Sequence, residues 1–295
     1  MQVNLMEQTD RNIVKKAVFD RPDDANKGTL GSLLCICGSF GMAGAAIMAG
    51  KAALRCGLGL LKTALPKSIY PIAAGAIFES VFFPLEETAD GKISKSNIDF
   101  LLCEAEKSSA VLIGCGLSVC DDTKTLVNSF IENCTKPLVL DADALNCVAV
   151  NPDILKKAKA PIIITPHPGE MARLVKSTPK AVNESRAEIA TYFAKEYGVV
   201  TVLKGAGTII ASPDGRAMIN RTGNSGMATG GSGDVLAGMT GSLLSQGAKP
   251  FDAAAAAVYL HGLAGDIAAE KLSKISMLPT DLINEIPQAY KRCGF

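Results

Sequence analysis

A glycine-rich segment, residues 220–238 (NRTGNSGMATGGSGDVLAG), constrains the fold of this chain more than any other stretch. Glycines such as Gly226 and Gly230 lack a Cβ, so consecutive backbone N–H groups can converge on one point. Apolar side chains then recur at helical spacing from Val235 onward, and Gly247 is positioned to end that helix. The pattern predicts a loop that leads into a helix N-terminus, which is a favourable place for an anion.

Asp234 is the one acidic residue of this segment. A carboxylate repels a bound phosphate, so Asp234 is a poor phosphate ligand. It is a reasonable base for a hydroxyl that attacks a phosphoryl group. The alternative is structural: Asp234, helped by Ser232 or Thr229, caps the helix, and glycines are common at such caps. The segment alone leaves both interpretations open.

The length and the net charge indicate a protein whose ligand or substrate is a small molecule. The 295 residues and the formal net charge of +1 fit one large α/β domain, residues 1–295, without a nucleic-acid partner. Nine cysteines scattered in apolar runs predict buried thiols in a reducing compartment, the cytoplasm, and not a disulfide framework. The polar N-terminus carries no signal-peptide pattern. Residues 28–50 lack charge, but repeated glycines favour a strand, a turn and a helix over a membrane span.

Short apolar runs that end in glycine or polar residues alternate with helical patterns along the chain. This alternation is typical of βαβ units and predicts a mostly parallel sheet, with ligands beyond the carboxyl ends of its strands. The expected strands are residues 33–37, 60–65, 110–114, 137–140, 161–164 and 199–203, with a hairpin of residues 207–212 and 217–220 around an Asp-Gly turn. The expected helices are residues 43–56, 96–107, 123–133, 153–157, 169–175, 180–196 and 253–272.

The sequence KGAGT, residues 204–208, lies between two expected strands. Its lysine and glycine backbone suit a nucleotide phosphate or ribose. Alternatively, Lys204 is a surface lysine before a hairpin. No Walker A motif occurs, and no G-x-G-x-x-G with a ribose-binding acid downstream. Their absence disfavours P-loop NTPases and Rossmann hydride-transfer enzymes.

Two further strand ends carry candidate polar residues. In TPHPGE, His167 and Glu170 could share a magnesium-phosphate site, with Glu170 acting through water. Alternatively, Glu170 favours the helix dipole and His167 caps the strand. In DADALN, Asp141 could orient a metal-bound water or a substrate hydroxyl, and Asp143 could do so or cap the next helix. GCGLS offers the backbone of Gly116, and His261 on an alanine-rich helix is interpreted as a core histidine.

Together these motifs resemble the ADP/ATP-dependent NAD(P)H-hydrate dehydratase family. The family has the fold of the ribokinase-like kinases, a three-layer α/β/α arrangement. The resemblance runs through NKGTLG, GSFGMAGAA, GCGLS, DADALN, TPHPGEMARL, LKGAGT, GNSGMATGGSGDVLAG and YLHGLAGD. Sugar and vitamin kinases of this fold usually begin the magnesium motif with Asn. His167 takes that place here, which favours the dehydratase branch.

The resemblance implies repair of the S epimer of hydrated NADH or NADPH (NADHX or NADPHX). ADP, in preference to ATP, phosphorylates the added ring hydroxyl, and phosphate is then eliminated. Asp234 is the implied base, and Mg²⁺ is implied near Glu170, held through water. The implied anion hole is Gly231, Ser232 and Gly233. The hydrated dinucleotide is expected against Ala45, Gly116, His167 and Asp234, and the nucleotide against Lys204, Gly205, Ala206, Gly207, Thr208 and Gly233.

The chain departs from the family pattern at three positions, which bear on substrate contacts. Asn26 stands where the family often has His, and Arg221 and Ser225 replace frequent prolines. Larger relatives carry an epimerase domain before this one, and too few residues precede Asn26 to hold it. A separate NAD(P)H-hydrate epimerase is therefore the expected functional partner, and a homotetramer is the expected assembly.

Two alternatives stay open at this stage. One is a ribokinase-like kinase of a small alcohol, such as hydroxymethylpyrimidine or hydroxyethylthiazole, which would use the same base and keep its phosphoester. The other is a nucleotide-binding module without catalysis. Asp234 argues against that module, because phosphate binds more easily without a nearby carboxylate.

Overall fold

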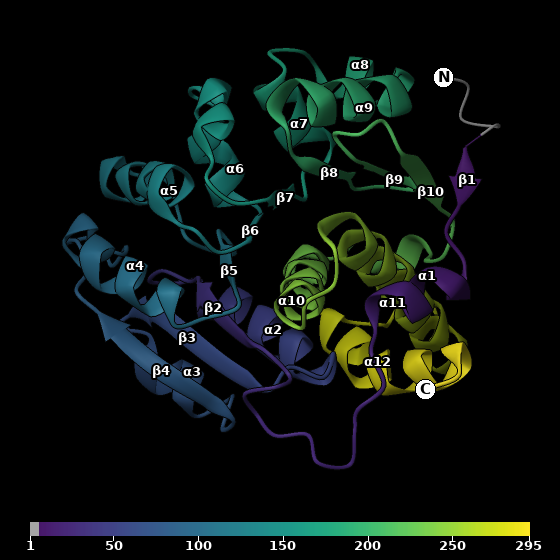
Figure 1. The fold of residues 1–295 in the computed structure, drawn as a ribbon, viewed down its shortest axis with the longest axis horizontal. Helices are drawn as coiled ribbons and strands as arrows, with labels where there is room; N and C mark the ends of the chain where they lie inside the picture. The colour runs from purple at the N-terminus through teal and green to yellow at the C-terminus, as the bar shows by residue number, and fades with distance from the viewer. Residues whose placement is uncertain (1–5) are drawn as a thin grey trace.

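One ten-stranded sheet runs through the computed structural model of the chain, which describes residues 6–295 (Figure 1). Residues 1–5, the start of the polar N-terminal segment, lie outside the described residues. The order across the sheet is β1-β10-β9-β8-β7-β6-β5-β2-β3-β4. The strands are β1 (Glu7–Gln8), β2 (Ser32–Ile36), β3 (Leu60–Pro66), β4 (Ser80–Leu85), β5 (Ala110–Ile113), β6 (Leu138–Leu140), β7 (Ile162–Ile164), β8 (Val200–Leu203), β9 (Thr208–Ala211) and β10 (Ala217–Asn220).

Seven consecutive strands of the sheet run parallel to one another: β4, β3, β2, β5, β6, β7 and β8. Their central members, such as β5 and β7, are apolar and wholly buried, as expected where helices cover both faces. β9 pairs antiparallel with both β8 and β10, and the expected Asp-Gly turn joins β9 to β10. The mostly parallel sheet predicted from the sequence is therefore confirmed.

Helices cover both faces of this sheet and give three layers (Figure 1). One face holds α1 (Arg11–Ala17), α2 (Ala43–Arg55), α10 (Ser232–Ser245), α11 (Pro250–Leu272) and α12 (Pro279–Cys293). The other face holds α4 (Ile98–Glu106), α5 (Asp121–Asn133), α6 (Asp143–Val148), α7 (Pro168–Leu174), α8 (Pro179–Glu184) and α9 (Arg186–Tyr197). The short helix α3 (Tyr70–Ala74) packs near β3 and β4.

Several elements differ from the sequence prediction. Residues 180–196 form two helices, α8 and α9, because Ser185 leaves the helical conformation at φ −130° and ψ 38°. Residues 153–157 belong to a 3₁₀ helix, η3 (Pro152–Lys157). The edge strand β4, the two-residue strand β1 and helix α3 were not predicted at all. Two further 3₁₀ turns are η2 (Lys95–Asn97) and η4 (Ser225–Met227).

Helices α2 and α10 approach each other unusually closely. A Cβ on Gly238 of α10 would lie 2.1 Å from the backbone oxygen of Ala49 on α2, nearer than any real Cβ contact. Only glycine permits this packing. The two helices therefore form one closely packed pair beneath the candidate site.

The cysteines and the apolar segments agree with the sequence analysis. All nine cysteines are free thiols, and seven of them are buried, whereas Cys103 is exposed. The uncharged run of residues 28–50 forms β2, a turn and part of α2. Across residues 6–295, no helix combines the length and the apolar character that crossing a bilayer requires.

Candidate active site

Polar side chains gather where parallel strands of the sheet end. Cys115 follows β5, Asp141 follows β6, Thr165 follows β7 and Lys204 follows β8. The first turn of α10 brings Asp234 to the same place. The carboxyl edge is where α/β sheets bind ligands, and the sequence analysis placed the site there.

A buried ion pair forms the centre of this cluster. Lys204 Nζ lies 2.8 Å from Asp141 Oδ1 and 3.9 Å from Glu170 Oε2. The Thr165 hydroxyl donates a hydrogen bond of 2.6 Å to Asp141 Oδ1. Burial lowers the pKa of Lys204, but Asp141 and Glu170 more than offset it, so the pKa rises and the ammonium persists. The side chains of Lys204 and Asp141 are only 18% and 2% exposed, so Lys204 is not a surface lysine.

Asp234 lies beside this ion pair with a perturbed carboxyl group. Burial, and then the charge of Asp141, raise the pKa of Asp234 to about 6. One ligand atom each from Asp234, Asp141 and Cys115 lies within 4.8 Å of the others. The α10 N-cap is Gly231, with φ 106°, and no side chain caps the helix. Asp234 is therefore not the cap that the alternative interpretation required.

The N-terminus of α10 faces the Lys204 ammonium. A Cβ on Gly233 would lie 3.3 Å from Lys204 Nζ, so glycine leaves room for the lysine. The Ser232 N–H already donates to Thr229 O at 3.2 Å. Within residues 6–295, no acceptor is found for the N–H groups of Gly231 and Gly233. These two N–H groups and the Lys204 ammonium together suit an anion.

Arg186 at the start of α9 shapes the KGAGT loop between β8 and β9. Its Nη2 donates to the backbone oxygens of Leu203 at 2.8 Å and Lys204 at 3.1 Å. Gly205 adopts φ 140°, which only glycine tolerates well, and the Thr208 hydroxyl donates to Gly205 O at 3.0 Å. Sequence reasoning missed Arg186, because nothing in its helical pattern marks a residue that binds a distant loop.

His167 and Glu170 form a capping box at the start of α7. His167 Nδ1 accepts from the N–H of Gly169 at 2.9 Å, and Glu170 Oε2 accepts from the N–H of His167 at 2.8 Å. Burial, and then Lys204, lower the pKa of His167, while burial raises that of Glu170. His167 therefore caps a helix rather than a strand, and Glu170 keeps the first-turn position expected of it.

Gly116 lies in a loop that Asp143 holds, whereas Asp141 belongs to the ion pair. Gly116, at φ 63°, packs against Ala45, because a Cβ on Gly116 would lie 2.8 Å from Ala45 Cβ. Asp143 is the first residue of α6, and its Oδ2 accepts the Ser118 N–H at 2.8 Å. Asp143 thus fixes the loop that contains Gly116, whereas Asp141 belongs to the ion pair. The sequence did not separate these two roles.

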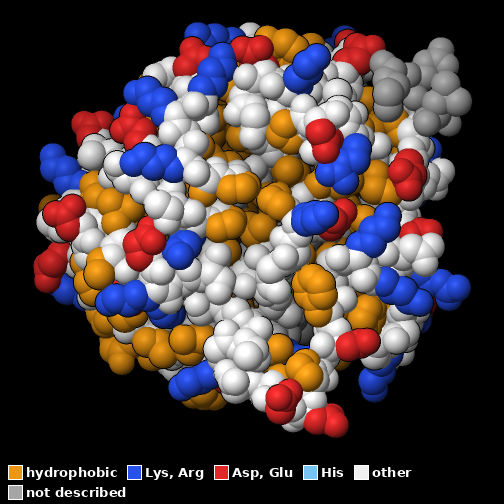
Figure 2. Space-filling model, viewed as in Figure 1, with side chains coloured by type: hydrophobic (Ala, Val, Ile, Leu, Met, Phe, Trp, Pro, Cys, Tyr) orange, Lys and Arg blue, Asp and Glu red, His pale blue; other side chains and the backbone are white. Residues whose placement is uncertain are grey.

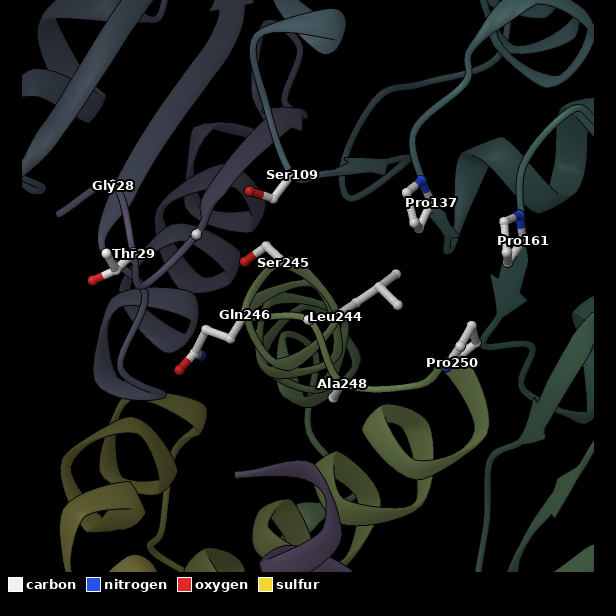
Figure 3. A pocket seen from close by; sticks show the side chains of 12 residues that line it. Gly28, Thr29, Ser109, Pro137, Pro161, Leu244, Ser245, Gln246, Ala248 and Pro250 are labelled. Atoms are coloured by element: carbon white, nitrogen blue, oxygen red, sulfur yellow. The ribbon is translucent and has the colours of Figure 1, made fainter. Parts of the chain in front are cut away.

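Asn26 lies away from the Asp234 cluster. Its side chain accepts N–H groups of its own turn, from Gly28 at 2.9 Å and Thr29 at 3.3 Å. Gly28 and Thr29 line a cavity of about 410 Å³ at the amino ends of the strands (Figure 3). Arg221 is exposed, and Ser225 begins η4 in the loop before α10. None of these three belongs to the cluster around Asp234.

Charge is mixed on the face of the molecule that Figure 2 shows. On the face seen in Figure 2, Lys and Arg side chains alternate with Asp and Glu side chains and do not gather in one patch. This distribution agrees with the net charge of +1 and with the expectation of a small-molecule ligand.

The model of the NAD(P)H-hydrate dehydratase family matches residues 33–288. The chain belongs to this family. It is 43% identical over 267 residues to the bifunctional NAD(P)H-hydrate repair enzyme of Moorella thermoacetica, covering 90% of this chain and 50% of that protein. It is 38% identical over 253 residues to the ADP-dependent (S)-NAD(P)H-hydrate dehydratase of Neisseria meningitidis, covering 85% of this chain and 81% of that protein.

Structural similarity to the family extends over nearly the whole of this chain. The structure of the ADP/ATP-dependent NAD(P)H-hydrate dehydratase from Bacillus subtilis, co-crystallised with ATP and Mg²⁺, superposes with a TM-score of 0.84 and 31% identity. The match covers 98% of this chain and 99% of that one. A ribokinase-like superfamily protein of Enterococcus faecalis also superposes with a TM-score of 0.84 and 25% identity over 99% of this chain and 98% of that one, which confirms the ribokinase-like three-layer fold. The chain spans about half the length of most of the curated relatives it matches, which are bifunctional repair enzymes.

Proposed function

We propose that this chain is a single dehydratase domain, residues 1–295, that restores NADH or NADPH from the S epimer of the hydrated forms, with ADP as the preferred donor. The observation that carries the proposal is Asp234, a half-buried carboxylate with a pKa of about 6 beside an anion-binding helix N-terminus. Membership of the dehydratase family supplies the reaction class, and the Neisseria relative is described as ADP-dependent.

Asp234 takes the proton of the added ring hydroxyl as this oxygen attacks the terminal phosphoryl group of the nucleotide. The N–H groups of Gly231 and Gly233 and the Lys204 ammonium lie where they stabilise negative charge on that group. Phosphate then leaves with the electrons of its C–O bond as the lone pair of the ring nitrogen forms an iminium, and loss of a proton from the adjacent ring carbon to the departing phosphate restores the double bond. Asp141 keeps Lys204 charged and in place throughout.

The carboxylates of this site suit Mg²⁺, which prefers oxygen ligands and retains several waters. Glu170 would hold the ion through water, because its Oε2 already accepts the His167 N–H. Bound Mg²⁺ would shield the charge of the nucleotide phosphates. The Lys204 ammonium, 3.9 Å from Glu170, limits how closely a cation can approach this carboxylate.

The remaining site residues receive their proposed ligands from their positions around Asp234. Ala45 and Gly116, in mutual contact, would receive the hydrated dinucleotide together with His167, and the loop of residues 204–208 would receive the nucleotide. A separate epimerase would supply the S epimer, since several relatives are bifunctional repair enzymes. We also propose a cytoplasmic location and a homotetrameric assembly.

Recovery of reduced-nicotinamide absorbance from hydrated NADH tests the proposal. The reaction contains Mg²⁺ and ADP, ATP or no nucleotide, and inorganic phosphate is followed in parallel. We expect recovery only with nucleotide, fastest with ADP, and equal in amount to the phosphate released. Binding of nucleotide without any recovery would instead indicate a kinase of a small alcohol.

A further inference from the structure

Two unsatisfied polar atoms lie at the anion-binding end of α10. Among the buried side chains of residues 6–295, four polar atoms lack a hydrogen-bond partner, and two of these are Ser232 Oγ and His261 Nε2. Ser232 is the first residue of α10 and is only 8% exposed. Buried polar atoms are nearly always hydrogen-bonded, so an unpartnered pair at one place indicates a ligand.

His261 reaches this place from helix α11. Its ring contacts the backbone of Ser232, and this contact partly offsets the burial that lowers the pKa of His261 to about 4. Burial and the nearby charge of Lys204 keep the imidazole neutral at pH 7. A neutral imidazole offers a hydrogen bond without the desolvation cost of a buried charge.

The loop before α10 is bound to α11 on both sides of His261. The Thr222 hydroxyl donates to Tyr259 O at 3.0 Å. Asp266 Oδ2 accepts the Gly223 N–H at 2.9 Å. A Cβ on Gly262 would lie 2.2 Å from Thr222 Oγ1, so this contact requires glycine next to His261. The ring is therefore held in a fixed position relative to the loop.

We propose that Ser232 and His261 form a polar pair for one oxygen of the phosphoryl group transferred from the nucleotide. The Ser232 hydroxyl donates to that oxygen, and His261, whose ring contacts the backbone of Ser232, holds this residue in position. Among the described residues, the Ser232 hydroxyl has no hydrogen-bond partner, so it is free for the phosphoryl oxygen. The Lys204 ammonium faces Gly233 of the same helix turn, so the pair, the helix N-terminus and a cation surround one position. This inference rests on the proposed function.

The test is calorimetric binding of ADP with Mg²⁺ to Ser232→Ala, His261→Leu and the double variant. We expect each single variant to lose about tenfold in affinity for ADP, the size of one good hydrogen bond to a charged group. The double variant should lose little more than either single one, because the two residues act on one oxygen. Adenosine, which has no phosphate, should bind all variants equally.

Two controls separate positioning from structure. His261→Gln keeps an N–H donor and should recover most of the affinity lost in His261→Leu. Ser245→Ala, at the other end of α10, removes a buried hydroxyl that bonds Ser242 O and should leave ADP binding unchanged. If His261→Leu does not fold, Ser232→Ala and His261→Gln still decide the question.

Unchanged ADP affinity in Ser232→Ala would overturn the inference, and so would losses that multiply in the double variant. Equal losses for ADP and adenosine would also overturn it, because the phosphate would then not be the group recognised. Failure of the unsubstituted protein to bind ADP would refute the proposed function itself, and this inference with it.

Discussion

The two edges of the same sheet differ sharply in chemistry. The carboxyl edge holds the Lys204–Asp141 ion pair and Asp234. The amino edge holds a cavity of about 410 Å³ (Figure 3), and none of the described residues that line it has an ionisable side chain. Open space alone therefore does not mark the functional site. What marks it is the set of buried charges that the parallel strands bring together at one edge.

Helix α10 connects these edges and shows the same contrast within one element. Its first turn carries Asp234 and the free N–H groups, whereas its last turn contributes Leu244 and Ser245 to the lining of the cavity. Substitutions at its two ends should therefore act on different properties of the protein.

The largest effect is expected from Asp234→Asn at the carboxyl edge. Loss of the base should reduce turnover by about 10³-fold, within the usual range for general-base catalysis, while ADP affinity stays the same or improves. Steady-state kinetics and calorimetry measure the two quantities. Ser109→Ala, in the lining of the amino-edge cavity, is the control and should keep full turnover. Substantial activity in Asp234→Asn would refute the assignment of the base.

The next effect is expected from Lys204→Met, which leaves the Asp141 carboxylate buried and unpaired. We expect a loss of about 3 kcal/mol in the free energy of unfolding, together with weaker nucleotide binding. Lys156→Met removes an exposed lysine, 2.6 Å from Glu196, and should cost much less stability, because solvent screens this pair. Urea denaturation measures the free energy of unfolding of both variants. If the two variants lose equal amounts of unfolding free energy, burial of the Lys204–Asp141 pair does not matter for stability.

A smaller effect is expected from acidification. Since Asp234 must be ionised to accept a proton and its pKa is about 6, kcat/KM should fall about tenfold per pH unit below pH 6. Asp143→Asn should lower activity and move the midpoint slightly to lower pH, because Asp143 fixes a loop and its charge also contributes to the raised pKa of Asp234. A profile that stays flat down to pH 5 would exclude Asp234 as the titrating group.

The smallest effect is expected in stability. Because folding raises the pKa of Asp234 from 3.8 to about 6, the ionised carboxylate destabilises the folded state above pH 6. Asp234→Asn should therefore stabilise the protein by about 1–2 kcal/mol at pH 8, and the gain should vanish below about pH 4. Thermal unfolding at both pH values measures this. Asp121→Asn, at an exposed first-turn position of α5, is the control and should show no such gain.

The sequence was sufficient to predict the central parallel strands and the position of Asp234. Short runs such as residues 162–164 are apolar throughout and end in polar residues, so their burial and direction follow from local pattern. β4 escaped prediction because Pro84 interrupts its pattern, and proline is tolerated there only because β4 is an edge strand. The break at Ser185 was not predicted, because residues 180–196 contain no glycine or proline to mark it.

Long-range polar contacts were the least predictable part of the site. Lys204 and Asp141 are 63 residues apart, and only the strand order brings their side chains to 2.8 Å. The link from Arg186 to the backbone of residues 203–204 has no sequence signal. His261 was interpreted as core, because its alanine-rich helix suggests packing and gives no indication of Ser232 nearby.

Gly238 limits the substitutions that this protein can accept during evolution. With the Ala49 oxygen only 2.1 Å from the place of a Cβ, the position rejects every side chain, alanine included. The separation of Ala45 on α2 from Asp234 on α10 is thereby fixed by the absence of a methyl group one helical turn away from each of them. Substrate range can evolve through the loops at the ends of these helices, but not through the distance between the helices.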